Sequence, residues 1–134
     1  MNDYVKLSPE MPASVDAASS INARILAIGD IDIWRETCGD IPTHRGLEFG
    51  SIDLLKGAYL TVLRPHLIVS PVVAPNFDCL DVAYALFQQS FGGAYRALAR
   101  STPKPAMIRK EVRAICPGLD FEIIPLDGKT DFLS

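Results

Sequence analysis

One stretch of the chain, residues 64–81, most limits what it can fold into. It opens with Arg64-Pro65, continues as the apolar run 66–73, and passes through Ala-Pro-Asn-Phe to Asp78. A continuous apolar run this short is typical of a parallel strand that is buried on both faces. Because Asp is a favoured helix N-cap, the stretch predicts a buried strand, a tight loop and a helix start. Pro71 has no backbone N–H for a strand ladder and is expected to mark the end of the strand.

The rest of the chain alternates in the same way between apolar runs and helical periods. Strands are predicted at residues 24–28, 47–49, 66–73, 94–99 and 119–124. Strands and helices that alternate with short connections are the signature of a doubly wound α/β fold, and right-handed crossovers place helices on both faces of the sheet. We therefore expect a three-layer α/β domain with a flavodoxin-like parallel sheet of about five strands in the order 2-1-3-4-5.

Helical periods predict which side chains face the core. Ser51 is a plausible N-cap for a helix whose buried face carries Leu55, Ala58, Tyr59 and Val62. The helix that starts at Asp78 is expected to bury Leu80, Ala83, Tyr84, Phe87 and Phe91. Ser101 or Thr102 is expected to cap a further helix, with Pro103 near its first turn.

Composition narrows the class of protein. The chain has 134 residues, of which 49% are hydrophobic and 22% charged, and its net charge is −3. Residues 1–20, rich in Ser, Ala, Pro and Asp, are interpreted as a flexible tail, and residues 21–134 as a single domain. A mildly acidic chain with scattered basic residues argues against a nucleic-acid surface. No apolar run approaches the length of a membrane span.

The cysteines and the N-terminus bear on location. Cys38, Cys79 and Cys116 are an odd number with no CxxC spacing, which indicates reduced, partly buried thiols. The chain starts without a charged segment followed by an apolar run, so no secretion signal is evident. We therefore expect a cytoplasmic protein.

The segment around residues 64–82 resembles the centre of a response-regulator receiver domain, and the similarity of pattern extends over residues 23–126. In that family a strand ends in a phosphorylatable Asp and is followed by a Met-Pro-x-x-Asp-Gly loop. The corresponding loop here is residues 74–79, which keeps the proline and Asp78 but has lost the glycine. Pro71 stands at the phosphoacceptor position.

The resemblance places other substitutions in the receiver pocket. Gly29 and Asp30 match the acidic pair that holds Mg²⁺ in the family, so one carboxylate remains. The position of the family's hydroxyl falls near Ala99, with Ser101 close by, and Ile124 stands where a lysine is usual. Phosphoryl transfer needs a nucleophile, a metal and a cation, and a lone aspartate is a poor Mg²⁺ site. The resemblance therefore implies a degenerate receiver with no catalytic residue, no metal and no cofactor.

The favoured hypothesis is a non-catalytic signalling or protein-interaction module that binds a protein partner or itself. Receivers usually end in a fifth helix, but only about ten residues follow Ile124 here, too few for a normal helix. The resulting uncovered sheet face or edge favours a homodimer. The alternative is a small-molecule or nucleotide binder that uses the carboxyl edge of the sheet near Asp30, Pro71, Asn76 and Ser101. An enzyme of unknown reaction at the same edge ranks last, because the sequence offers no acid–base pair.

Simpler interpretations compete at the remaining polar positions. Asp30 and Asp32, like Asp78 and Asp81, are residue types that commonly occupy turns and helix starts. Cys79 at a helix N-terminus is a candidate for a thiol of lowered pKa. No histidine can be placed beside it from the sequence, so a nucleophilic role has little support.

Overall fold

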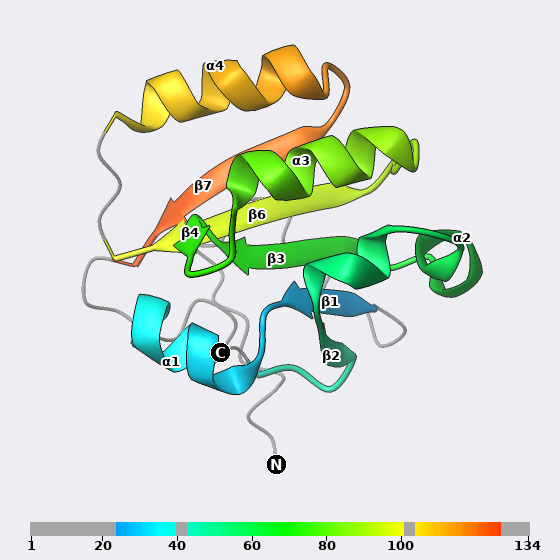
Figure 1. Cartoon of the computed structure of the whole chain (residues 1–134), viewed down its shortest axis with the longest axis horizontal. Helices are drawn as coiled ribbons and strands as arrows, with labels where there is room; N and C mark the ends of the chain where they lie inside the picture. Colours follow the sequence, from blue (N-terminus) through cyan, green and yellow to red (C-terminus); the bar gives the residue numbers. More distant parts are fainter. Residues whose placement is uncertain (1–23, 40–42, 101–103, 127–134) are drawn as a thin grey trace.

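A five-stranded parallel sheet forms the centre of the molecule. The computed structural model describes residues 24–39, 43–100 and 104–126, and in Figure 1 the strands follow one another in the order β2-β1-β3-β6-β7. Every neighbouring pair is parallel. The strands are β1 (Ile25–Ile28), β2 (Leu47–Gly50), β3 (Leu67–Pro71), β6 (Ala94–Ala99) and β7 (Asp120–Pro125). This is the predicted 2-1-3-4-5 order, so the flavodoxin-like topology is confirmed.

Helices cover both faces of the sheet and make three layers. One face packs against Trp34 and Cys38 of α1 (Ile31–Cys38), which contact Ile25, Ala27 and Leu67 in the same apolar cluster. The other face is covered by α2 (Tyr59–Leu63), α3 (Cys79–Gln88) and α4 (Pro105–Ile115). The doubly wound α/β fold is therefore confirmed.

The helix predicted to run from Ser51 through Val62 is wrong, because two short elements replace it. Ser51 caps a single 3₁₀ turn, η3 (Ile52–Leu55), and α2 starts only at Tyr59. Gly57 between them has a φ of +93°, which a helix cannot contain. The interruption rotates α2 away from the expected face, so Val62 is 71% exposed.

The core stripe predicted for α3 is correct at some positions and wrong at two. Ala83 is buried, and Leu80 and Phe91 are partly buried against the core. Tyr84 and Phe87 instead lie 55% and 51% exposed on the outer surface. The buried positions belong instead to Val82, Ala85 and Leu86. These residues form a second apolar face at helical spacing, which the sequence pattern alone did not distinguish from the aromatic one.

Pro71 ends β3 without breaking the sheet. The N–H of Val72 donates to the carbonyl of Leu98 on β6 at 2.9 Å. Because the backbone N–H groups of successive strand residues point to opposite sides, the nitrogen of Pro71 faces β1. The pairing of β1 with β3 stops at Val69. Pro71 therefore costs no ladder hydrogen bond, as expected for a proline at a strand end.

A small hairpin that the sequence did not predict follows β3. Strands β4 (Val73–Ala74) and β5 (Phe77–Asp78) pair antiparallel across the Pro75-Asn76 turn.

The last helix differs from the prediction in its start. Lys104 is the N-cap of α4, and Pro105 takes the first helical position. The predicted caps at 101 and 102, and Pro103, lie outside the described residues. Within the described part of the chain, no helix has the length and apolar character needed to span a bilayer.

Candidate functional site at the carboxyl edge of the sheet

A cavity opens where β1 and β2 end, at the edge of the sheet to which the strand arrows point in Figure 1. Its volume is about 210 Å³. Its lining consists of Gly29, Asp30, Ile33, Phe49, Gly50, Ser51, Ile52, Asn76 and Phe77. Ligands of doubly wound folds bind at this edge of the sheet, so the cavity lies where the sequence predicted a ligand site.

Gly29 and Asp30 join β1 to α1 and form one side of the cavity. Gly29 has a φ of +109°, and a Cβ there would lie 3.2 Å from Cγ2 of Ile33. Asp30 is the N-cap of α1, and its Oδ1 accepts a hydrogen bond from the N–H of Ile33 at 2.9 Å. One oxygen of this exposed carboxylate therefore caps the helix.

Among the described residues that were predicted for a ligand site, Asn76 lines the cavity together with Asp30. Asn76 lies in the turn of the β4–β5 hairpin, which was not predicted from the sequence. The hairpin brings this residue to the cavity at the end of β1, although it lies 46 positions after Asp30 in the chain. Pro71, Asp78 and Ile124 do not line the cavity. Ile124 packs with the apolar cluster on the α1 face, and Ser101 lies outside the described residues.

Asp78 and Asp81 have a structural role at the start of α3. The carboxylate of Asp78 accepts from the N–H of Asp81, and the carboxylate of Asp81 accepts from the N–H of Asp78, both at 3.0 Å. This reciprocal arrangement is a capping box and satisfies two N–H groups that the first turn leaves without partners. The simpler interpretation of this pair is confirmed.

A buried hydrogen bond behind Pro71 was missed in the sequence. The hydroxyls of Ser70 and Tyr95 lie 2.6 Å apart, and both side chains are fully buried. Ser70 Oγ also donates to the carbonyl of Pro71 at 2.8 Å. A serine has one proton, so Tyr95 must donate to Ser70. Burial is the main cause that raises the pKa of Tyr95 well above its ordinary value, and the phenol stays protonated.

Cys79 does not have the properties of a nucleophile. Its side chain is buried, and its backbone N–H donates to the carbonyl of Val72 at 2.8 Å. Burial, followed by the charge of Asp78, raises the pKa of the Cys79 thiol to about 12. Burial also raises the pKa of Cys38 and of Cys116. The three thiols are free and buried, as the cysteine pattern predicted.

The raised thiol pKa values predict slow chemistry and a pH-dependent stability. We expect native protein to react slowly with a disulfide reagent at pH 8 and denatured protein to react at once.

The thiol of Cys79 ionises near pH 9.0 when the chain is unfolded and near pH 12 when it is folded, so its contribution to stability is complete below pH 9 and is lost as the pH rises toward 12. Between pH 8 and pH 10, the free energy of unfolding measured in urea should fall by about 1 kcal/mol more in the native chain than in the Cys79→Ala variant. Equal pH dependence in both proteins would contradict this assignment.

The site offers limited chemistry. Its polar side chains are the exposed carboxylate of Asp30 and the hydroxyl of Ser51, which both cap helical turns, and the amide of Asn76. Among the residues that the structure describes, no cluster of three or more His, Cys, Asp or Glu side chains is placed to hold a metal ion. The arrangement can orient a small polar ligand by hydrogen bonds, but the described residues place no acid–base pair in the cavity.

The fold and site define a doubly wound α/β domain that is compatible with flavodoxin-like and receiver-like folds. No protein-family model matches the chain, and searches of curated proteins and of solved structures give no significant match.

Proposed function

We propose that this chain is a non-catalytic protein-interaction module, a receiver-like domain that cannot be phosphorylated in the usual way. The proposal rests first on Pro71, which ends β3 where the resemblance to receivers puts the phosphoacceptor, and which offers no nucleophile. Nearby carboxylates already cap helices: Asp30 caps α1, and Asp78 with Asp81 caps α3. The scaffold of a phosphorylation switch would then act by binding alone.

The observation that carries the interaction role is the outer surface of α3. Tyr84 and Phe87 lie one turn apart there, and each is more than half exposed. Large aromatic side chains contribute most strongly to protein interfaces and are costly to leave in water. Because a two-fold axis brings the same surface of two copies together, one exposed aromatic pair can bury the other. We propose a homodimer that packs through this face of α3.

The interaction role predicts a dimer that depends on Tyr84 and Phe87. Native mass spectrometry and light scattering over a dilution series should give a dimer mass for the native chain. The double variant Tyr84→Lys/Phe87→Lys should be monomeric, with a dissociation constant raised at least about a hundredfold by loss of the central contacts. The matched control is Val62→Lys, which changes an apolar side chain of α2 that is 71% exposed.

Three outcomes would contradict parts of the proposal. A monomer mass at every concentration would contradict the homodimer. If a different protein stayed bound during purification, the interaction role would still stand. Equal effects of the α3 and α2 variants would move the interface away from Tyr84 and Phe87. Incorporation of phosphate from acetyl phosphate and Mg²⁺ at a residue of the receiver-like pocket would overturn the non-catalytic role.

The second candidate function is a small-molecule or nucleotide binder at the carboxyl edge. The cavity that joins Asp30 with Asn76 favours it. The same native mass spectra test it, because a stoichiometric small-molecule adduct on gently purified protein would support it. An adduct that survives in the Tyr84→Lys/Phe87→Lys variant would separate ligand binding from the dimer.

A further inference from the structure

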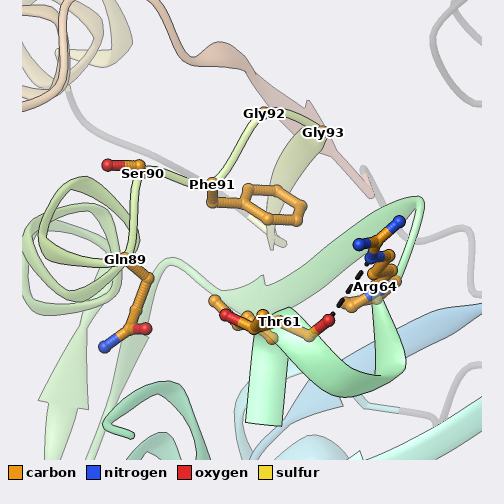
Figure 2. A pocket seen from close by; sticks show the side chains of 9 residues that line it. Thr61, Arg64, Gln89, Ser90, Phe91, Gly92 and Gly93 are labelled. Carbon is orange, nitrogen blue, oxygen red and sulfur yellow. Dashed lines mark hydrogen bonds between the residues drawn. The ribbon is translucent and has the colours of Figure 1, made fainter. Parts of the chain in front are cut away.

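A second cavity lies at the opposite, amino edge of the sheet, where α2 leads into β3 and α3 leads into β6. Its volume is about 300 Å³, which exceeds the 210 Å³ at the carboxyl edge. One wall comes from the end of α2, including Thr61 and Arg64, and the other from residues 89–93 (Figure 2). No known or proposed activity of the chain uses this cavity.

Arg64 gives the cavity a positive charge that the protein does not neutralise. Its Nε donates to the carbonyl of Thr61 at 3.3 Å, a long bond that uses one of its five N–H groups. Among the described residues, no ion pair includes Arg64, and no carboxylate lines the cavity. The guanidinium therefore retains donors for an anion, in a chain whose net charge is −3.

Both helices that border the cavity end in left-handed residues other than glycine. Arg64 ends α2 with φ 50° and ψ 61°, and Ser90 follows α3 with φ 53°. Glycine is the favoured residue at such helix ends, because a Cβ disfavours the left-handed region. Two of the three described non-glycine residues with positive φ thus flank one cavity. The N–H of Arg64 donates to the carbonyl of Leu60 at 3.0 Å and ends α2, so the backbone holds Arg64 at the border of the cavity.

Phe91 supplies a flat apolar surface beside this charge. In Figure 2 its ring extends from the loop after α3 toward the cavity, whereas the hydroxyl of Ser90 points away from the ring. Gly93 makes room for the ring: a Cβ there would lie 2.6 Å from Cζ of Phe91 and 2.9 Å from the carbonyl oxygen of His66. The ring therefore has a defined place that a larger residue at 93 would not permit.

We infer that this cavity binds a small planar organic anion, with the flat part of the ligand on the Phe91 ring and its carboxylate on the Arg64 guanidinium. A guanidinium pairs with a carboxylate through two parallel hydrogen bonds, and an aromatic ring stacks on a planar ligand. The carbonyl ends of α2 and α3 lie at the same edge and disfavour an anion. Binding of the anion therefore depends on the charge of Arg64.

The test is a ¹H–¹⁵N NMR titration of the full chain with benzoate, compared with neutral benzyl alcohol. Benzoate is expected to give saturable shifts at the amides of Gly92 and Gly93 and at the Nε–H of Arg64. Benzyl alcohol should bind at least about tenfold more weakly, because it cannot form the charged hydrogen bonds. Shifts that do not saturate, or that lie elsewhere on the chain, would overturn the inference.

Variants separate the charge from the fold. Arg64→Gly removes the guanidinium and favours the left-handed backbone, so the variant should fold, melt no lower than the native chain and lose at least about tenfold in benzoate affinity. The matched control, Arg113→Gln in the last turn of α4, removes an exposed charge far from the cavity in the chain and should change the affinity by less than about twofold. Phe91→Leu should weaken benzoate binding while Arg64 is intact. Unchanged affinity in Arg64→Gly would overturn the inference.

Discussion

Truncation of Tyr95 to alanine is expected to lower the free energy of unfolding by about 4 kcal/mol, the range for a fully buried aromatic residue. Tyr95 has no exposed surface, and its ring packs on Phe121 with centroids 5.2 Å apart and planes tilted by 48°. Its hydroxyl bonds Ser70 at 2.6 Å behind the end of β3. Alanine would leave a cavity between β6 and α3 and would remove both contacts. Urea denaturation followed by circular dichroism measures the loss.

Two milder variants distinguish the hydrogen bond from the packing. Tyr95→Phe keeps the ring and removes a donor, and Ser70 still donates to Pro71, so we expect a loss of about 1 kcal/mol. Ser70→Ala leaves the Tyr95 hydroxyl buried without its partner, and we expect about 2 kcal/mol, because an unsatisfied buried group costs its full desolvation. If Tyr95→Phe were costlier than Ser70→Ala, the assignment of Tyr95 as the donor would be wrong.

The sheet was predictable because its central strands are buried on both faces. Residues 24–28 and 66–73 are apolar almost throughout, and a parallel central strand is the element that such a run specifies. The strand order followed from the alternation with helices and from the handedness of crossovers. Helix details were less predictable, because Gly57 interrupts a period that looked continuous across Ser51 to Val62.

The sites were harder to predict because they depend on contacts between distant segments. The β4–β5 hairpin brings Asn76 to the cavity that Asp30 also lines, and two-residue strands leave almost no periodic signal in the sequence. The amino-edge cavity depends on left-handed conformations at Arg64 and Ser90, residue types that the sequence does not associate with helix ends. The exposure of Tyr84 and Phe87 was hidden because aromatic residues at helical spacing are usually core.

Arg96 is a clearer signal in the sequence, because it is a charged residue in a predicted buried strand. It is the charged residue of β6, within the run Ala-Tyr-Arg-Ala-Leu-Ala, and it is 1% exposed. Successive residues of a strand face opposite sides, so Tyr95 enters the α3 face while Arg96 enters the α1 face. A charged residue in a buried strand requires a partner, and the partner lies on the neighbouring strand β7.

Removal of the Asp120 carboxylate is accordingly expected to destabilise the fold by about 3 kcal/mol, because it leaves a buried guanidinium without its counter-charge. Nη2 of Arg96 lies 3.0 Å from Oδ1 of Asp120, and Nη1 donates to the carbonyls of Tyr95 and Asp120 at 2.9 and 2.6 Å. Among the residues that the structure describes, Nε of Arg96 has no hydrogen-bond partner. The Asp120 side chain is 57% exposed, which places the expected loss at the lower end for a broken buried pair. Urea unfolding of Asp120→Ala measures it.

Two further variants make the argument specific to a buried charge. Arg96→Met/Asp120→Ala removes both charges and fills most of the volume, so the double variant should be more stable than Asp120→Ala alone. Glu122→Ala on the same strand breaks the exposed pair with Arg109, whose atoms lie 3.5 Å apart, and should cost less than about 0.5 kcal/mol. Equal losses in Asp120→Ala and Glu122→Ala would mean that water reaches Arg96 as easily as Arg109. The α1 face of the sheet would then be open at β6, and it would be the stronger candidate for a protein interface.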